Sequence, residues 1–393
     1  MLARGVVRNC DQRMLRGAVL VPRPRAWYAH RARSCSLDTA TTAGRSPGSC
    51  HGYGEGVSGT RHIEPVEPSK TTRRIGLVLG GGGAVGAAYH AGALTALEQD
   101  LGWDARDASV IVGTSAGSLV GALLRMGVPA SDMAALTVGA STRDARADLV
   151  EALLDRPEFL PLTLGSVFRV PRPPTYAMLF GLLKVSARQR SVSLGALSMM
   201  LPEGRHALEP HLALFDGDEG QWPSSALRVC AVRRRDWHRT VFGSTSKPQP
   251  RLSAALAASC AVPGYFAGVD IDGELYIDGG VVSPTNADVL GREQIDLAIV
   301  VSPMTGTGRR RSVPQLIRRL CRQSLDAELR LLRKRGIPAV VIEPGEEVLE
   351  HMSFDFMSEQ ASHEIVQSAF LDTGTQIRAS EALMALSNRG VRV

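Results

Sequence analysis

From residue 73 onward, apolar residues fall into short continuous runs that alternate with stretches of helical period. The run RRIGLVLGGGG at 73–83 predicts a buried strand of the parallel type, followed by a glycine turn. In AAYHAGALTALEQD at 87–100, apolar residues recur on one helical face. A second unit follows at once, with a strand at 110–112 and a helix at 116–127. Two such units in succession predict a parallel sheet covered by helices.

The rest of the chain continues this pattern. The further predicted elements are a hairpin at 226–244, a helix at 251–260, a hairpin that turns at Asp272-Gly273, and strands at 295–303 and 337–345. The interval 130–220 is mainly helical in pattern but broken by prolines, so its elements are not ordered from sequence. We therefore predict the α/β class, with three α/β/α layers and a mostly parallel central sheet.

Composition fits a globular protein and sets the first part of the chain apart. The 393 residues are 44% hydrophobic and 21% charged, with a net charge of +6. This allows one large α/β domain or two smaller ones. Residues 1–50 contain nine arginines and only two acidic residues, and they show no helical or strand period. We predict that residues 1–70 form a basic, disordered arm; a transit peptide and an upstream-start artefact are the alternatives.

Targeting signals and metal ligands are sparse in the sequence. No apolar run approaches the roughly eighteen residues of a membrane span, and GAVLVP at 17–22 is too short for a secretory signal. The six cysteines are scattered, without a CxxC pair or a cluster with histidine. We therefore expect a cytoplasmic protein with reduced thiols and no bound metal.

The second strand–helix unit contains a candidate nucleophile. Gly113-Thr114-Ser115-Ala116-Gly117 is a GxSxG motif between a predicted strand and a predicted helix. In a nucleophile elbow the serine occupies a strained turn, and glycines on both sides let neighbouring segments approach closely. The context favours Ser115 as a nucleophile, supported by Gly113 and Gly117, over a purely structural turn.

A serine nucleophile needs a base, and the sequence offers two kinds. An α/β-hydrolase triad would use a late histidine, His351 or His363, but neither has a motif around it. The other candidate is Asp278, which precedes Gly279 and Gly280 at the end of a predicted strand. A carboxylate there has backbone space beside it, although an Asp-Gly-Gly triplet alone is more often a turn.

The glycine-rich stretch GGGGAVG at 80–86 also has two interpretations. Gly81, Gly83 and Gly86 have the spacing of a dinucleotide-binding fingerprint, which requires an acidic residue at the end of the second strand. That strand instead runs into the GxSxG motif. The alternative is a loop whose backbone N–H groups converge on another anion, because glycines leave the backbone open to close approach.

Four separated motifs occur in an order typical of one family: the glycine-rich loop, GxSxG, ASCAVPGYF at 258–266, and Asp-Gly-Gly. Over residues 73–345 the chain resembles the patatin-like phospholipases. The resemblance implies a patatin-like three-layer fold, a catalytic domain at 71–345 and a C-terminal helical extension at 346–393 that packs on it. It also implies an acyl-ester hydrolase that acts on lipids or lysophospholipids without a cofactor.

The resemblance assigns roles to the motif residues. Ser115 is the expected nucleophile, and Asp278 is the expected direct acceptor of its proton. Backbone N–H groups of the glycine-rich loop are expected to bind the oxyanion. The remaining expected site residues are the glycines of the oxyanion hole, Gly81, Gly82, Gly83 and Gly86, and the glycines beside Asp278, Gly279 and Gly280.

One residue departs from the family pattern. The family commonly has arginine or lysine just before the last glycine of the loop, whereas this chain has Val85, on what the sequence predicts as an exposed turn. Backbone donors do not depend on that side chain, so esterase activity is still expected. A weakly active or noncatalytic lipid-binding protein of the same fold is the alternative, and a Ser-His-Asp α/β-hydrolase is a less favoured one.

Three further features bear on partners and specificity. Residues 309–335 contain ten arginines and lysines against two acidic residues. A solvated helix over the core is the simpler interpretation, and contact with an anionic membrane is the alternative. The region 155–190 is expected to act as a lid that decides substrate preference. His90 is expected to pack in a helix near the loop, and no nucleic-acid partner is predicted.

Overall fold

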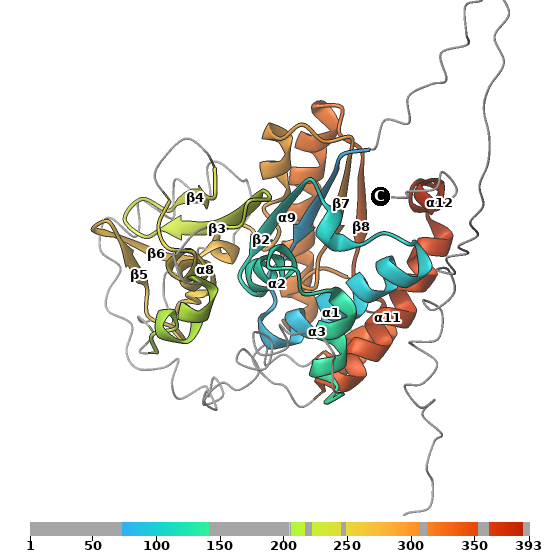
Figure 1. Ribbon diagram of the computed structural model, residues 1–393, viewed down its shortest axis with the longest axis horizontal. Helices are drawn as coiled ribbons and strands as arrows, with labels where there is room; N and C mark the ends of the chain where they lie inside the picture. The colour runs from blue at the N-terminus through green and yellow to red at the C-terminus, as the bar shows by residue number, and fades with distance from the viewer. Residues whose placement is uncertain are drawn as a thin grey trace, which may run out of the picture. The chain divides into compact units, whose positions relative to one another are not determined.

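The structure is a computed structural model, and it describes residues 73–140, 204, 206–216, 222–244, 249–306, 308, 313–352 and 361–387 (Figure 1). The chain divides into two units, 1–67 and 68–393, and the described residues belong to the second. The predictions for the arm at 1–70 and for the lid at 155–190 fall outside the described residues.

Within the described ranges, eight strands form one sheet in the order β5-β6-β3-β2-β1-β7-β8, with β4 paired to β3. Their bounds are β1 (Ile75–Leu79), β2 (Val110–Thr114), β3 (Leu227–Arg233), β4 (His238–Phe242), β5 (Val269–Ile271), β6 (Glu274–Asp278), β7 (Leu297–Val301) and β8 (Ala339–Ile342). Neighbours from β8 through β7, β1 and β2 to β3 run parallel. β4, β5 and β6 join by antiparallel pairs. The prediction of a mostly parallel sheet is confirmed.

The central strands are buried on both faces. Every residue of β1, β2 and β7 is buried, which explains their continuous apolar runs. Because side chains alternate along a strand, successive residues enter different cores. Leu77 and Leu79 pack in one cluster, and Val78 between them packs in another.

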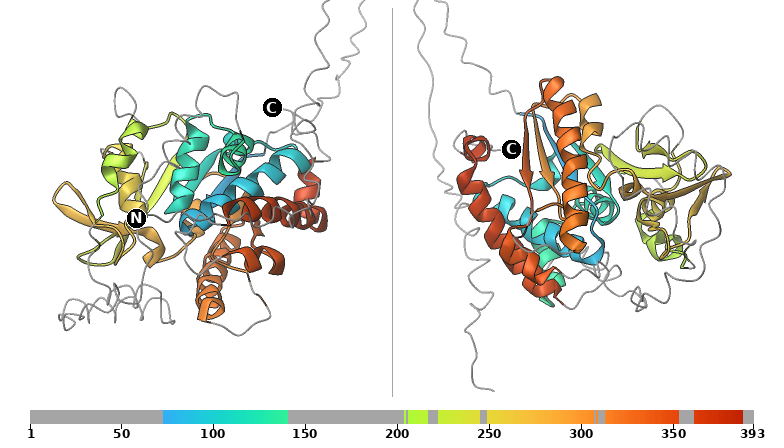
Figure 2. Two further views of the ribbon diagram at one scale, coloured as in Figure 1. Left: turned by 90° about the horizontal axis from the view of Figure 1, so that it is seen from below. Right: turned by 180° about the vertical axis from the view of Figure 1, so that it is seen from behind.

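Helices cover both faces of this sheet. Their bounds are α1 (Gly83–Asp100), α2 (Ala116–Arg125), α3 (Ala130–Thr137), α8 (Leu252–Cys260), α9 (Val313–Lys334), α10 (Glu346–His351), α11 (Ser362–Ala379) and α12 (Glu381–Ser387). Side chains of α1, α2, α3, α8 and α11 pack in the core of Leu77, whereas α9 packs in the core of Val78. Figure 2 shows α1 and α11 side by side, apart from α9. The predicted three-layer α/β/α fold is therefore confirmed.

Helix α1 starts earlier than the sequence predicts. It begins at Gly83 and not at residue 87, because the glycine turn is short. Gly83, the first residue of the helix, has a φ of 62°, which glycine adopts readily. Farther along, a Cβ at Gly92 would lie 2.3 Å from the carbonyl oxygen of Val366. Glycine at this position lets α11 pack closely against α1.

The described part of the basic stretch 309–335 is mainly helix α9. The buried face of this helix carries Cys321, Leu325 and Leu332, whereas Leu316 and Leu331 are exposed on it among basic residues. This one-sided burial agrees with a solvated helix over the core, and contact with an anionic membrane stays a prediction. Among the helices of the described ranges, none combines the length and the apolar character that a membrane crossing requires.

Candidate active site

Strand β3 brings the ends of β2 and β6 together. β2 pairs parallel to β3 and ends where Thr114 lies opposite Cys230. β6 pairs antiparallel to β3 and ends where Asp278 lies opposite Ala231. β4 pairs with β3 over residues that overlap both of these stretches, so it occupies the opposite edge of β3. β2 and β6 therefore pair along the same edge of β3, one after the other, and their carboxyl ends face each other. Ser115, which follows Thr114, and Asp278 therefore lie side by side.

Ser115 forms a strained elbow between β2 and α2. Its backbone has φ 52° and ψ −127°, and its side chain is buried with 7% exposure. A positive φ is rare for a residue with a Cβ, and such strain is typical of functional turns. The flanking glycines are required, because a Cβ at Gly113 would lie 2.5 Å from the Cα of Ser118, and one at Gly117 would lie 2.1 Å from the carbonyl oxygen of Leu79.

Asp278 is a buried carboxylate with one free oxygen. Its Oδ1 accepts the N–H of Gly280 at 2.6 Å, and its Oδ2 makes no hydrogen bond with the described residues. Burial raises the pKa of Asp278 from 3.8 to about 6, although the Ser115 hydroxyl and the Gly280 N–H act in the opposite direction. A carboxylate with this pKa is a stronger base than an ordinary aspartate and is still deprotonated at neutral pH.

Gly279 explains how the Asp278 turn fits against the elbow. A Cβ at this position would lie 2.3 Å from the carbonyl oxygen of Cys230 and 3.2 Å from the methyl carbon of Thr114. Any other residue would push the aspartate turn away from the end of β2.

The glycine-rich loop lies directly against the nucleophile, since a Cβ at Gly81 would be 3.3 Å from the Cβ of Ser115. Two of the predicted oxyanion donors are already in use. The N–H of Gly81 donates to the carbonyl of Pro284 at 2.8 Å, and the N–H of Gly86 donates to the carbonyl of Gly82 at 2.9 Å in the first turn of α1. The predicted donor role is therefore wrong for Gly81 and Gly86, because neither N–H is free.

The N–H groups that remain are those of Gly82 and Gly83, for which no hydrogen bond with the described residues is seen. Both lie at the start of α1, where the first N–H groups of a helix have no partner within it. The start of α2 lies beside them at Ser115. The positive ends of two helix dipoles therefore point toward the nucleophile, where negative charge is stabilised.

His90 fixes the glycine-rich loop from within α1. Its ring is fully buried, and Nε2 donates to the carbonyl of Gly80 at 2.7 Å. Burial lowers the pKa of His90 to about 4, so the ring is neutral at physiological pH and keeps its proton on Nε2. The sequence places His90 near the loop but gives no sign of this bond.

A second buried contact supports the loop from behind. The ring of Pro303 packs against it, and a Cβ at Gly82 would lie 3.2 Å from the Cβ of Pro303. Arg318 on α9 is buried and donates to the carbonyls of Pro303 at 2.7 Å and Thr305 at 2.9 Å. These bonds hold the 303–305 turn in place.

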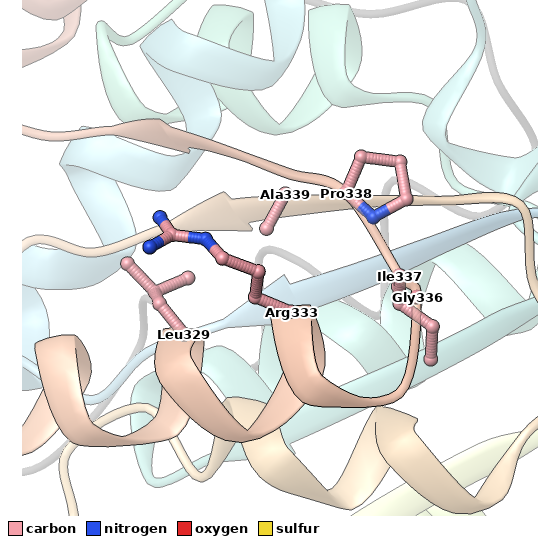
Figure 3. A pocket seen from close by; sticks show the side chains of 6 residues that line it. All are labelled: Leu329, Arg333, Gly336, Ile337, Pro338 and Ala339. Atoms are coloured by element: carbon pink, nitrogen blue, oxygen red, sulfur yellow. The ribbon is translucent and has the colours of Figure 1, made fainter.

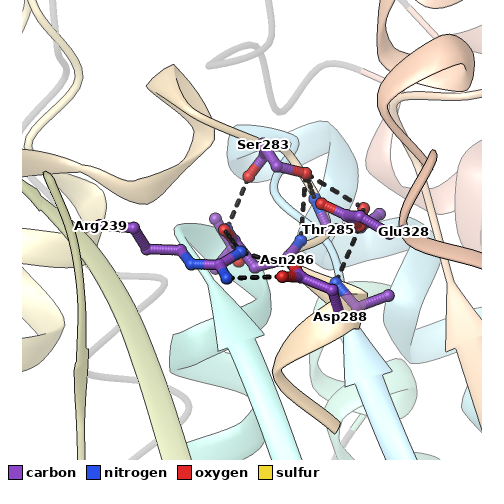
Figure 4. Close-up of polar contacts among 8 residues, drawn as sticks. Arg239, Ser283, Thr285, Asn286, Asp288 and Glu328 are labelled. Atoms are coloured by element: carbon purple, nitrogen blue, oxygen red, sulfur yellow. Dashed lines mark hydrogen bonds and ion pairs between the residues drawn. The ribbon is translucent and has the colours of Figure 1, made fainter. Parts of the chain in front are cut away.

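The segment 283–287, a few residues after Asp278, joins both halves of the site (Figure 4). The amide Nδ2 of Asn286 donates to the Thr114 hydroxyl at 3.0 Å. Oε2 of Glu328 on α9 accepts the Thr285 hydroxyl at 2.6 Å and the Ala287 N–H at 2.9 Å. Because Pro284 in the same segment accepts the N–H of Gly81, this segment contacts the oxyanion loop and the nucleophile strand together.

A hollow of about 440 Å³ lies elsewhere, between the end of α9 and the start of β8 (Figure 3). It is lined by Leu329, Arg333, Gly336, Ile337, Pro338 and Ala339. Ser115 follows the carboxyl end of β2, whereas this hollow lies at the amino end of the parallel strand β8. It contains neither a nucleophile nor a base and is not part of the candidate active site.

A family comparison covers the same region. The model of the family described as patatin-like phospholipase matches residues 77–290, which is more than half of the chain and includes both Ser115 and Asp278. The chain belongs to the patatin-like phospholipase family. No curated protein matches the chain.

Solved structures with a similar arrangement share little sequence with this patatin-like chain. VipD from Legionella pneumophila is 14% identical, with a TM-score of 0.38, over 80% of this chain and 67% of VipD. Human GIVD cytosolic phospholipase A2, in complex with methyl gamma-linolenyl fluorophosphonate, is 14% identical, with a TM-score of 0.36, over 81% of this chain and 59% of that protein. ExoU from Pseudomonas aeruginosa, in a complex with SpcU, is 17% identical, with a TM-score of 0.32, over 80% of this chain and 57% of that chain. The chain spans between about half and two thirds of these proteins.

Val85, the departure from the pattern of the patatin-like family, is not on an exposed turn. The loop ends at Gly82, so Val85 lies in the first turn of α1, where it is 1% exposed and packs in the core. The expectation of an exposed position is wrong because the helix begins before the last glycine of the motif.

Val85→Arg is therefore expected to destabilise the fold, by about 3 kcal/mol or more, because a guanidinium would be buried without a partner. Val85→Ala removes volume without adding charge and is expected to cost less, about 1–3 kcal/mol. Urea unfolding of both variants measures the difference. A Val85→Arg protein as stable as the wild type would show that the first turn of α1 opens to solvent.

The late histidines do not form a triad with the described site. His363 is exposed, and its ring bonds Gln367 on the same helix at 2.8 Å. His351 is half-buried at the end of α10. No hydrogen bond among the described residues joins either histidine to the Asp278 carboxylate, which accepts the Gly280 N–H.

Three residues of the site have no role assigned to them by the sequence. The Ser115 N–H donates to the hydroxyl of Ser259 at 2.9 Å, and this hydroxyl donates to the carbonyl of Cys230 at 2.7 Å. Ser259 lies in the ASCAVPGYF motif, but this motif does not indicate which residue Ser259 contacts. Asn286 and Glu328 belong to no motif, and they lie beside the site because of the way the chain folds.

Proposed function

We propose that this chain is a serine acyl-ester hydrolase of the phospholipase A, lysophospholipase or esterase type, in which Ser115 is the nucleophile and Asp278 the proton acceptor. Family membership supports a lipid acyl hydrolase in general. The observation that carries the dyad is the buried Asp278 carboxylate, with a pKa raised to about 6, beside the strained Ser115 elbow. This pairing is what direct proton transfer from the serine to a carboxylate requires.

The reaction follows from these positions. Ser115 Oγ attacks the acyl carbonyl carbon while its proton passes to the free oxygen of Asp278, and the carbonyl electrons move onto the oxygen. The N–H groups of Gly82 and Gly83 and the starts of α1 and α2 stabilise this oxyanion. When the intermediate collapses, the ester C–O bond breaks and the departing alcohol takes the proton from Asp278. Water activated by the same carboxylate then hydrolyses the acyl-enzyme.

Esters are the expected substrates in this mechanism. A carboxylate is a weaker base than histidine and activates the serine less, so substrates with a better leaving group are favoured, which means esters over amides. Neither a metal nor a cofactor takes part in the proton transfers. Neutral lipids and phospholipids both supply such esters, and the position of Val85 leaves no cationic side chain on the loop itself.

An activity-based probe tests the proposal. We expect a fluorophosphonate to label the wild-type protein covalently at Ser115 and the same protein to release fatty acid from a lysophospholipid. Ser115→Ala should abolish both signals, and Ser118→Ala, which changes the serine three residues later, should keep the label. If the folded wild type neither labels nor hydrolyses any of a panel of acyl esters, the noncatalytic lipid-binding alternative takes the place of this proposal.

A further inference from the structure

Arg239 on β4 contacts the far side of the Asn286 network (Figure 4). Its Nη1 donates to Oδ1 of Asn286 at 3.0 Å and to Oδ1 of Asp288 at 2.6 Å, and its Nη2 donates to Oδ2 of Asp288 at 2.7 Å. The planar guanidinium therefore bonds the amide and both oxygens of the carboxylate together, which lysine cannot do with one ammonium group.

The contact with Arg239 fixes which way the Asn286 amide points. Because Oδ1 accepts from Arg239, Nδ2 faces the opposite side, where it donates to the Thr114 hydroxyl at 3.0 Å and to the Ser283 carbonyl at 2.7 Å. Asn286 is fully buried, and its backbone has a left-handed φ of 52°. Its amide is thus held on both sides with little room to rotate.

Thr114 is the last residue of β2 and directly precedes Ser115. A shift of Thr114 would move the elbow relative to Asp278 and to the glycine-rich loop. Reacting groups that move by about 1 Å lose on the order of 100-fold in rate. The chain of contacts from Arg239 through the buried Asn286 to the buried Thr114 is well placed to prevent such a shift.

We propose that Arg239 is a positioning residue for the nucleophile, acting through Asn286 and Thr114. This inference rests on the proposed function, since it assigns Arg239 to the same reaction. The guanidinium touches neither Ser115 nor Asp278 among its hydrogen bonds, so its effect is on geometry and not on proton transfer.

The chain contains a matched control for Arg239. Arg228 on β3 pairs with Glu293 at 2.7 Å, and its side chain is 13% exposed, against 24% for Arg239. Both ion pairs tie the β3–β4 hairpin to the chain just after Asn286, through Asp288 in one case and Glu293 in the other. Only Arg239 bonds the Asn286 amide. A comparison of variants at the two arginines therefore separates the effect of losing an ion pair from the effect of losing the contact that positions Asn286.

The test compares Arg239→Met with Arg228→Met in the full chain, with a soluble short-chain ester as substrate and urea unfolding as a measure of stability. We expect both variants to lose stability, whereas Arg239→Met alone lowers kcat, by about 10- to 100-fold with KM within about twofold. The rate of fluorophosphonate labelling of Ser115 should fall in parallel. Arg239→Lys should recover part of kcat, because one of the bonds can reform.

A second variant covers the case in which Arg239→Met does not fold. Asn286→Asp keeps the acceptor for Arg239 but replaces the donor to Thr114, so it should lower kcat in the same way with the ion pair intact. Equal kcat losses in Arg239→Met and Arg228→Met, or an unchanged kcat in Asn286→Asp, would overturn the positioning role while the wild type stays active. A wild type that neither labels nor hydrolyses would overturn the proposed function and this inference with it.

Discussion

Asp278→Asn is expected to reduce ester hydrolysis by about 10³-fold or more, as far as Ser115→Ala does. Asparagine keeps the size of the side chain and an oxygen for the Gly280 N–H, but it cannot accept the proton of Ser115. Members of one catalytic unit do not lose rate additively, so the double variant should be no slower than either single one. The wild type should lose activity as pH falls through about 6, where Asp278 becomes protonated.

The same substitution is expected to stabilise the fold at neutral pH. The pKa of Asp278 is raised by burial from 3.8 to about 6, so the folded wild type favours the protonated carboxyl. This stabilisation is complete below pH 3.8 and is lost as pH rises through about 6. An uncharged asparagine avoids the loss, which amounts to an order of 3 kcal/mol for a shift of this size.

Thermal melting at several pH values, together with ester kinetics, checks both parts. The Tm of Asp278→Asn should exceed that of the wild type at pH 8, and the difference should disappear near pH 4. Asp216 is a control, because it is also buried and accepts the N–H and hydroxyl of Ser253 at the start of α8. Asp216→Asn should lower stability and keep most activity. An active Asp278→Asn enzyme would show that another group is the base.

Gly117→Ala is expected to lose activity and at least about 3 kcal/mol of stability. The new Cβ would lie 2.1 Å from the carbonyl oxygen of Leu79 and 2.7 Å from that of Gly80. Both are backbone atoms of β1 and the glycine-rich loop, so α2 would have to move away from them. The Ser115 elbow at the start of α2 would move with it.

Gly86→Ala is the matched comparison. Gly86 also lies in a helix beside the site, but the nearest heavy atom to its new Cβ would be 3.6 Å away, which is an ordinary contact. Alanine is favoured over glycine within a helix by about 1 kcal/mol, so this variant should be as stable as the wild type or more stable, with activity retained. Urea unfolding and ester kinetics on both variants decide the matter. Equal damage at the two positions would mean that the loop, and not the start of α2, is the crowded element.

The parts of the fold that sequence predicts are those with local causes. Continuous apolar runs marked the buried strands β1, β2 and β7, and the GxSxG spacing marked the strand–helix elbow, because each signal lies within a few neighbouring residues. The sequence predicts the start of α1 too late, because a run of glycines is typical of a turn, although Gly83 can begin a helix. It consequently predicts a surface position for Val85, which is buried.

The parts that sequence does not predict depend on residues far apart in the chain. The N–H of Gly81 is used by Pro284, and the amide of Asn286 is oriented by Arg239 before it reaches Thr114. The sequence around each of these residues does not indicate which distant residue it bonds. The same holds for Asp278, whose raised pKa comes from burial in the folded protein.

The meeting of β2 and β6 on one edge of β3 has a consequence for how this site tolerates change. Thr114 and Asp278 pair with Cys230 and Ala231, which are consecutive in β3, so the residue before the nucleophile and the base are held in a spacing of one residue step along β3. The connections that join β2, β3 and β6 do not enter into this spacing. Insertions in those connections should thus leave the relative position of Thr114 and Asp278 unchanged. A shift of β6 by a single residue, in contrast, would turn Asp278 to the other face of the sheet.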